Sequence, residues 1–376
     1  MWWIHSTGIV AAIALLVTFA APPARADSPQ RDPGPRKVVV GTTIYSIWQG
    51  WPGLDARLAE LGAMIDEMAA TARDQYDTGL DLAVLTEYAV TAGRPGDAAE
   101  VALPLHGPVL DYFAEKAREH ETYIIIPMIL EEDRGQGIYT NAAVLVDRQG
   151  ELAGIYRKVH PVAAPSQTVL EGGLTPGTEH AVFDTDFGRL GIQICWDMAY
   201  DEGWHALAEH GAEIVAWPSA SPQTIRPTVR AREGGYYIVS STPRNNATVF
   251  YPTGQVAAQI ESDASLESAH ATLVTQIDLD YEILGWQARL NNGALFDNTY
   301  GDRAGYHYSP REDGGVFWSN DPATPIAEMI KELGLELSHD SVERNRRLRD
   351  RIAADAPTLA PAQGTADAPP AVGAAE

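Results

Sequence analysis

The amino-acid sequence predicts an α/β fold in which mixed β-sheets are covered by helices. Short apolar runs rich in β-branched residues alternate along the chain with longer stretches of helical periodicity. Two of these runs meet at Arg148-Gln149-Gly150, a hairpin-type turn, whereas others are separated by helix-length crossovers. A chain with both kinds of connection is expected to form mixed rather than purely parallel or antiparallel sheets.

The first elements show the pattern clearly. Lys37–Tyr45 (KVVVGTTIY) is a β-branched run bounded by turns, as in a buried strand, and Leu54–Arg73 repeats Leu, Ile and Met at helical spacing. The same criteria predict further strands over Asp81–Leu85, Tyr123–Leu130, Ala142–Asp147, Leu152–Tyr156, Arg189–Cys195, Glu213–Trp217, Tyr236–Ser241, Ala247–Tyr251, Gln255–Ile260 and Thr272–Ile277. They predict further helices over Pro108–Glu119, Trp204–His210, Arg226–Gly234 and Ile326–Leu333.

Composition excludes several classes of function. The 27 Lys and Arg against 51 Asp and Glu give a formal net charge of −24, which argues against binding to nucleic acid or to anionic lipid. A single cysteine makes an internal disulfide impossible, and no Cys/His cluster has the spacing of zinc ligands. The chain contains neither a GxGxxG nor a P-loop motif, so a nucleotide cofactor is not indicated.

The two ends are expected to lie outside the folded domain. Gly8–Ala21 is a short apolar run followed by Ala24-Arg25-Ala26, so residues 1–26 are predicted to be a signal peptide. An uncleaved membrane anchor is the alternative, because the segment is nearly long enough to span a bilayer. Asp27–Arg36 reads as a Pro-rich linker, and Ala353–Glu376 as a disordered Ala/Pro-rich tail.

Three chemically capable residues lie at the predicted ends of strands: Glu87, Lys158 and Cys195. Sites of α/β proteins collect at the carboxyl ends of strands. A cysteine nucleophile needs a base, which a carboxylate supplies, and an ammonium group stabilises the oxyanion of a tetrahedral intermediate. Each residue also has a structural interpretation: Cys195 as inert core, Lys158 as a solvated strand end and Glu87 as a helix cap.

The segments around these residues carry a family resemblance. DLAVLTEY at Glu87, GIYRKVHP at Lys158 and GRLGIQICWD at Cys195 resemble the signatures of the nitrilase superfamily of carbon–nitrogen hydrolases. GAEIVAWPSAS, RAREGGYYIVSSTPRN and FYPTGQV resemble later segments of that family in the same order. The resemblance covers about Lys37–Asp280 and leaves residues 281–352 as a C-terminal extension.

The resemblance implies an α-β-β-α sandwich that usually dimerises sheet to sheet and needs neither metal nor organic cofactor. It implies that Glu87 is the general base, Lys158 the oxyanion stabiliser and Cys195 the nucleophile. Glu171, in LEGGLTPG, is the candidate for a second active-site carboxylate. The backbone N–H of Trp196 is a candidate to complete the oxyanion hole, with its ring as a wall of the pocket.

The expected activity is therefore hydrolysis of small linear amides or N-carbamoyl amines through a thioester on Cys195. Cys195-Trp196-Asp197 favours an amidase, because nitrile-hydrolysing members usually have Cys-Trp-Glu. A nitrilase and an amide transacylase remain open as alternatives on the same triad. A non-catalytic exported scaffold is the alternative from a different class. The expected partners are a small-molecule amide and a second copy of the chain, and the expected location is the periplasm or the exterior.

Overall fold

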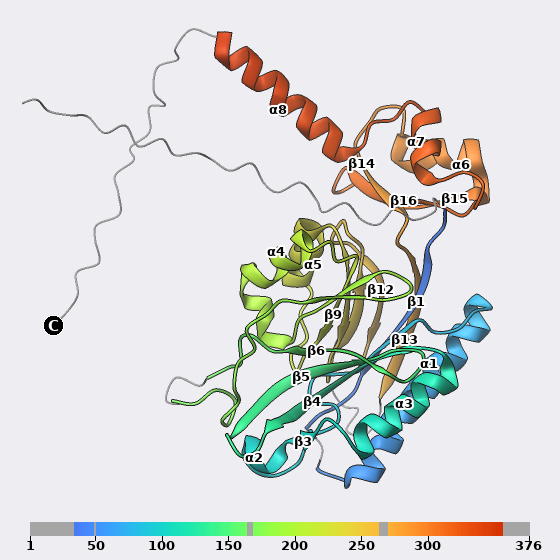
Figure 1. Ribbon diagram of the computed structural model, residues 1–376. Coiled ribbons are helices and arrows are strands. Elements are labelled where there is room, and N and C mark those ends of the chain that lie inside the picture. The colour runs from blue at the N-terminus through green and yellow to red at the C-terminus, as the bar shows by residue number, and fades with distance from the viewer. Residues whose placement is uncertain (1–33, 49, 164–167, 263–269, 356–376) are drawn as a thin grey trace, which may run out of the picture. The chain divides into compact units, whose positions relative to one another are not determined.

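The computed structural model describes residues 34–48, 50–163, 168–262 and 270–355. These residues form two compact units, one of Val39–Gln276 and one of residues 34–38 and 277–355 (Figure 1). The predicted signal peptide over residues 1–26 lies outside the described residues. Across the described ranges, no helix is both long enough and apolar enough to cross a membrane.

The first sheet of the larger unit has the strand order β13-β1-β2-β4-β5-β6, with β3 paired to β4. Its strands are β1 (Lys37–Ile44), β2 (Leu82–Val84), β3 (Leu103–Pro104), β4 (Tyr123–Asp133), β5 (Ile138–Val146), β6 (Leu152–Arg157) and β13 (Ala271–Asp278). β1, β2 and β4 are parallel, whereas β4, β5 and β6 are antiparallel neighbours. The sheet is therefore mixed, and the predicted hairpin between β5 and β6 is confirmed.

The second sheet has the strand order β12-β11-β10-β9-β8-β7. Its strands are β7 (Val182–Asp184), β8 (Arg189–Ile192), β9 (Ile214–Pro218), β10 (Tyr237–Ser241), β11 (Asn246–Phe250) and β12 (Val256–Glu261). β8, β9 and β10 are parallel, and antiparallel strands flank them. Both sheets thus contain parallel strands next to antiparallel ones.

Helices cover the outer face of each sheet (Figure 1). α1 (Leu54–Tyr76) and α3 (Pro108–His120) pack on the first sheet. The short α2 (Ala98–Val101) shares a small core with Tyr139 of β5. α4 (Asp201–Glu209) and α5 (Ile225–Gly234) cover the second sheet around a core that contains Trp204 and Trp217. The predicted α-β-β-α sandwich is confirmed.

Glycine permits close helix–sheet packing at one position in each sheet. A Cβ atom on Gly41 of β1 would lie 2.7 Å from Sδ of Met68 in α1. A Cβ atom on Gly191 of β8 would lie 2.9 Å from Cδ1 of Leu207 in α4. Both distances are shorter than carbon and sulfur atoms tolerate, so a larger residue at either position would push the helix away from its sheet.

Buried hydroxyl groups join the two sheets where β1 and β10 end. Oγ1 of Thr42 donates to the carbonyl of Ser240 at 2.6 Å, and Ile44 forms a parallel bridge with Thr242. The hydroxyl of Ser241 lies 3.0 Å from those of both Thr43 and Thr86. Because Thr86 directly precedes Glu87 in the chain, this junction fixes the backbone that carries the Glu87 carboxylate.

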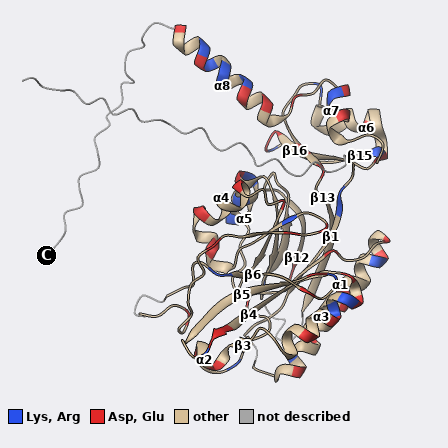
Figure 2. Ribbon diagram, in the orientation of Figure 1, with Lys and Arg blue, Asp and Glu red and all other residues tan. Residues whose placement is uncertain are grey.

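The second unit has a sheet of its own, with the order β14-β16-β15. Its elements are β14 (Tyr281–Gly285), α6 (Ala294–Tyr300), β15 (Ala304–Ser309), β16 (Gly314–Ser319), α7 (Ile326–Glu332) and α8 (Ser338–Asp355). A separate core packs α6 and α7 on this sheet around Phe296 and Phe317. Figure 2 shows acidic and basic residues interspersed along α8, in which no residue is buried.

α8 reaches Asp355, three residues beyond the expected end of the C-terminal extension. The rest of the predicted tail lies outside the described residues.

Candidate active site

Glu87 and Lys158 meet although 71 positions separate them in the sequence. Glu87 follows β2 and Lys158 directly follows β6, as predicted. Nζ of Lys158 lies 2.9 Å from Oε1 of Glu87, and both side chains are 1% exposed. Lys158 is therefore not a solvated strand end, and Glu87 is engaged in a buried ion pair rather than in a helix cap.

Glu171 supplies a second carboxylate to the same ammonium group. Its Oε1 lies 2.6 Å from Nζ of Lys158 and accepts the backbone N–H of Val162 at 2.8 Å. Its Oε2 accepts the hydroxyl of Tyr88 at 2.6 Å. The ammonium of Lys158 thus lies between two carboxylates, and the buried group carries a net negative charge when all three are ionised.

Asn141 of β5 binds both carboxylates at once. Its Nδ2 donates to Oε1 of Glu87 at 2.8 Å and to Oε2 of Glu171 at 3.3 Å. Its backbone carbonyl accepts the N–H of Lys158 at 2.8 Å. A single buried amide therefore fixes how the two carboxylates are oriented around the ammonium.

Cys195 lies on a turn and not at the end of a strand. The predicted strand Arg189–Cys195 is too long, because β8 ends at Ile192 and Cys195 opens a 3₁₀ helix that runs to Ala199. Cys195 has a φ of 43°, in the left-handed region that a residue with a Cβ adopts at an energetic cost. The indole Nε1 of Trp217 donates to its carbonyl at 3.1 Å and holds this backbone in place.

The thiol of Cys195 lies within the electrostatic reach of this ion-pair cluster. Burial and the charge of Glu87 raise the pKa of Cys195 to about 12, against the opposing effects of Lys158, Ser219 and the backbone of Ala220. The same Ala220 N–H donates to Oε2 of Glu87 at 2.7 Å. Cys195 is therefore a protonated thiol at neutral pH, placed beside a carboxylate that can take its proton.

The pKa of Lys158 responds to opposing influences. Burial lowers it, but the negative charges of Glu87 and Glu171 outweigh burial and raise it above its usual range. Lys158 is accordingly a permanent cation beside the thiol. A fixed positive charge in a site closed to solvent is suited to stabilising a developing oxyanion.

Comparison with known proteins shows the family of the chain. The family profile described as carbon-nitrogen hydrolase matches residues 44–283. The chain belongs to the carbon-nitrogen hydrolase family. The prediction of a nitrilase-superfamily hydrolase is confirmed at this level.

Curated relatives of this carbon-nitrogen hydrolase are amidases. Human omega-amidase NIT2 is 28% identical over 188 residues, which cover 44% of this chain and 67% of that protein. N-carbamoylputrescine amidase of Solanum tuberosum is 28% identical over 191 residues, 43% of this chain and 61% of that one. Human deaminated glutathione amidase is 29% identical over 241 residues, 57% of this chain and 71% of that one. The chain therefore spans between three-fifths and three-quarters of the lengths of these relatives.

Solved structures share the fold of this carbon-nitrogen hydrolase. Nit3 of Saccharomyces cerevisiae, a member of branch 10 of the nitrilase superfamily, has a TM-score of 0.53 at 20% identity. That comparison covers 67% of this chain and 93% of Nit3. A double mutant of the amidase from Nesterenkonia sp. AN1, in complex with acrylamide, has a TM-score of 0.52 at 17% identity over 64% of this chain and 91% of the amidase.

Trp196, the residue next to Cys195 in this carbon-nitrogen hydrolase, has a side chain that is 40% exposed. It is therefore partly exposed to solvent, whereas Glu87 and Lys158 are buried. Sequence reasoning did not single out Tyr88, Asn141 or the Ser219–Ala220 backbone. Only Ser219 carried a usable signal, because it follows the apolar strand β9 as Glu87 follows β2.

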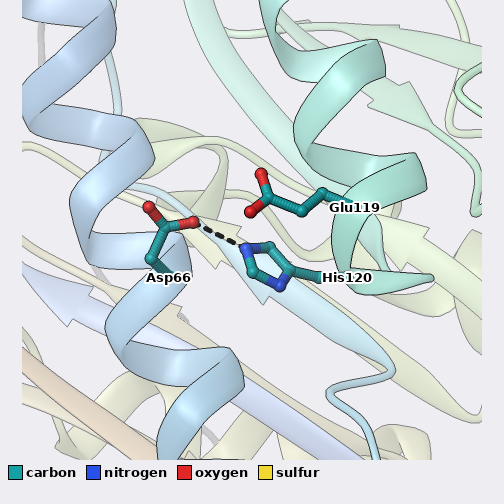
Figure 3. A group of neighbouring side chains, drawn as sticks. All are labelled: Asp66, Glu119 and His120. Atoms are coloured by element: carbon teal, nitrogen blue, oxygen red, sulfur yellow. Dashed lines mark hydrogen bonds and ion pairs between the residues drawn. The ribbon is translucent and has the colours of Figure 1, made fainter.

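A second group of acidic and histidine side chains lies between α1 and α3 (Figure 3). Ligand atoms of Asp66, Glu119 and His120 lie within 4.8 Å of one another. The ammonium of Lys116, however, binds Asp66 at 2.7 and 2.9 Å and Glu119 at 2.9 Å. A metal ion would have to displace this cation, so the group is an ion-pair cluster that joins two helices.

A surface cavity of about 380 Å³ lies between α4 and α5 of this carbon-nitrogen hydrolase. Asp201 and His205 of α4 and Ile225, Val229 and Arg230 of α5 line it. Neither Glu87, Lys158 nor Cys195 is among its lining residues. The cavity is thus separate from the cluster around Lys158.

Proposed function

We propose that this chain is a cysteine-dependent amidase that hydrolyses small linear amides or N-carbamoyl amines. The observation that carries the proposal is the Lys158 ammonium, held at 2.9 Å from Glu87 and 2.6 Å from Glu171, in a buried cluster that includes the only thiol of the chain. A structural ion pair would need only one carboxylate. A base, a cation and a nucleophile in one site are the parts of acyl transfer through a thioester.

The first half-reaction uses all three groups. The Glu87 carboxylate takes the proton of the Cys195 thiol while the sulfur forms a bond to the carbonyl carbon of the amide. The ammonium of Lys158, together with the backbone N–H of Trp196, binds the oxyanion of the tetrahedral intermediate. Protonated Glu87 then gives its proton to the leaving nitrogen, the carbon–nitrogen bond breaks, and an amine or ammonia departs.

The second half-reaction restores the enzyme. Glu87 takes a proton from water, whose oxygen attacks the thioester carbonyl. The second tetrahedral intermediate releases the sulfur, which regains its proton from Glu87, and a carboxylic acid leaves. Glu171 keeps Lys158 in position throughout, because its carboxylate is held by Tyr88 and Val162 as well as by the ammonium.

The names of the relatives support amides as the substrate class. Omega-amidase, N-carbamoylputrescine amidase and deaminated glutathione amidase all act on amide or carbamoyl nitrogen by name. The Cys195-Trp196-Asp197 sequence points the same way, since nitrile-hydrolysing members usually have Cys-Trp-Glu. Short aliphatic amides and N-carbamoyl amines are therefore the first substrates to test.

The test is a substrate panel of aliphatic amides, N-carbamoyl amines and nitriles, scored for ammonia release by the wild type and by Cys195→Ala. Amide or carbamoyl turnover that disappears in Cys195→Ala supports the proposal. Turnover of nitriles alone would make the protein a nitrilase, and added hydroxylamine forming a hydroxamate in place of the acid would reveal acyl transfer. A folded wild type with no activity and no labelling of Cys195 by iodoacetamide would favour the non-catalytic scaffold.

We also propose that the protein is exported and acts as a homodimer. Export rests on the apolar run Gly8–Ala21 with the cleavage-type sequence Ala24-Arg25-Ala26, and predicts a mature chain that starts at Asp27. The dimer rests on the family resemblance. N-terminal sequencing of protein from fractionated cells tests the first, and light scattering coupled to size-exclusion chromatography tests the second.

A further inference from the structure

Asp197 is a buried carboxylate that accepts hydrogen bonds from three separate parts of the larger unit. Its Oδ2 accepts the backbone N–H of Ile194 and the hydroxyl of Tyr156, both at 2.9 Å. Its Oδ1 accepts the backbone N–H of His160 at 2.9 Å and contacts Nδ1 of the same residue at 3.0 Å. The residue is 1% exposed, so these bonds replace the water that an ionised carboxylate would otherwise require.

The donors flank the proposed reacting groups on both sides. Tyr156 and His160 lie two residues before and two residues after Lys158, and Ile194 directly precedes Cys195. Tyr156 belongs to β6 of the first sheet, whereas Ile194 follows β8 of the second sheet. Asp197 therefore connects the segment that carries Lys158 to the turn that carries Cys195, across the two sheets.

The position of Asp197 is itself fixed. Its N–H donates to the carbonyl of Ile194 at 3.0 Å, and its carbonyl accepts the indole N–H of Trp204 at 3.0 Å. The His160 ring is stacked on Tyr200, with centroids 3.7 Å apart, and its Nε2 lies 3.1 Å from Glu202. The carboxylate has no room to turn without breaking several of these contacts.

We propose that Asp197 is a positioning residue that sets the spacing between the Lys158 ammonium and the Cys195 thiol. The inference rests on the proposed function, in which the thiolate attacks a carbonyl whose oxyanion Lys158 must bind at the same moment. A displacement of about 1 Å between catalytic groups lowers turnover on the order of a hundredfold. No contact between Asp197 and the substrate is required.

Asp197→Asn is the principal variant. An amide offers one acceptor oxygen, and its NH₂ group faces N–H or O–H donors at the other position, so at least one set of bonds is lost. We expect kcat to fall by about a hundredfold while KM changes by less than about threefold, because ground-state binding of the substrate does not involve Asp197. A merely structural role would lower the amount of folded enzyme and leave the kcat of the folded fraction unchanged.

Tyr156→Phe removes one donor without creating a buried donor that faces another donor. We expect it to lower kcat by about fivefold. In the double variant Asp197→Asn with Tyr156→Phe, we expect kcat to fall by less than the product of the two single decreases, because both changes act on one carboxylate. Glu202→Gln is the matched control, since it removes the other carboxylate partner of His160 and leaves the bonds of Asp197 in place. It should keep kcat within about twofold of the wild type.

A second readout makes the test independent of the substrate panel. Cys195 is the only cysteine, so the rate of iodoacetamide labelling reports its environment alone. We expect the pH profile of labelling to move in Asp197→Asn and to stay in place in Glu202→Gln. A wild type that hydrolyses no substrate would overturn the proposed function, and the labelling profile would still decide the role of Asp197.

Some results would overturn the inference. A folded Asp197→Asn variant whose kcat equals that of the wild type would do so. If the wild type is inactive, a folded Asp197→Asn variant with the same pH profile of labelling as the wild type would do so. Strictly multiplicative losses in the double variant would also contradict it. If Asp197→Asn does not fold, Tyr156→Phe decides, and a folded Tyr156→Phe with unchanged kcat overturns the inference.

Discussion

Replacing Glu87 by Gln tests whether one carboxylate both keeps Cys195 protonated at rest and moves protons during turnover. The two roles predict opposite changes in two rates: alkylation of Cys195 and hydrolysis of an amide. Without the charge of Glu87, the thiol ionises more readily and reacts faster with an alkylating reagent. Without its basicity, the proton of Cys195 has no acceptor during attack on an amide, and hydrolysis slows.

The magnitude of the change in alkylation rate follows from the high pKa of the Cys195 thiol. With a pKa of about 12, only about one Cys195 in ten thousand is a thiolate at pH 8. Burial is the larger cause of this high pKa and Glu87 the second, so removing the charge should lower the pKa by about one and speed alkylation at pH 8 about tenfold. Hydrolysis should fall by roughly 10²- to 10⁴-fold, the usual contribution of a general base.

The amide introduced by Glu87→Gln will not keep every contact of the carboxylate. Its single oxygen can accept from Lys158 and Asn141, which both bind Oε1 of Glu87 in the wild type. Its NH₂ group would then face the N–H of Ala220, which donates to Oε2 of the wild-type carboxylate. An unpaired buried N–H costs about 1–3 kcal/mol, so a lower melting temperature is expected in a protein that still folds.

The assay compares two rates on the same samples. Iodoacetamide labelling of the only cysteine is followed by intact mass between pH 6 and pH 10, and hydrolysis is followed by ammonia release. Glu119→Gln, which removes an exposed carboxylate on α3, is the control and should change neither rate. The reasoning is refuted if labelling and hydrolysis fall together in Glu87→Gln, or if hydrolysis is retained.

Further changes test the surroundings of the site. Lys158→Met leaves two carboxylates facing each other without a cation, so we expect a loss of about 3–5 kcal/mol in urea unfolding together with the loss of turnover. Arg57→Met should lower the melting temperature, because its buried guanidinium donates to the carbonyls of Ala89 and Ala92 at 3.0 and 3.1 Å. The hydrogen bond that the His160 ring donates to Asp197 raises the pKa of His160. The stabilisation that this bond gives is complete below the unfolded pKa of His160 and is lost as the pH rises through the folded one. The melting temperature of the wild type should therefore exceed that of His160→Gln by more at pH 6 than at pH 9. EDTA should leave turnover unchanged, because Lys116 already occupies the one acidic and histidine cluster found in the described ranges.

The elements around the site were predictable wherever local pattern determines them. The predicted strands Asp81–Leu85 and Leu152–Tyr156 end within one residue of β2 and β6, so strand ends alone placed Glu87 and Lys158 at one rim. The same reasoning gave a wrong end for β8. The Asp197 carboxylate accepts a hydrogen bond from the N–H of Ile194, and the chain turns before Cys195. A pattern of apolar residues does not predict such a side-chain contact.

Contacts between distant segments account for the rest of what sequence reasoning missed. Asn141 binds Glu87 from 54 positions away and Glu171 from 30, so no spacing rule could connect them. The strands of the second unit were missed for a different reason. Its sheet is short and Gly- and aromatic-rich, as in GGVFWS of β16, and lacks the β-branched runs that identify the other strands.

The protonation of Cys195 at rest also bears on how long the protein survives in the presence of peroxides. Peroxide oxidises the thiolate form of cysteine, and the sulfinic and sulfonic acids that follow are not readily reversed. A thiol with a pKa of about 12 offers almost no thiolate between turnovers, and the chain has no second cysteine to rescue a sulfenic acid as a disulfide. The high pKa of the thiol beside Glu87 is therefore expected to slow the permanent oxidation of a group that no second cysteine of this chain can repair.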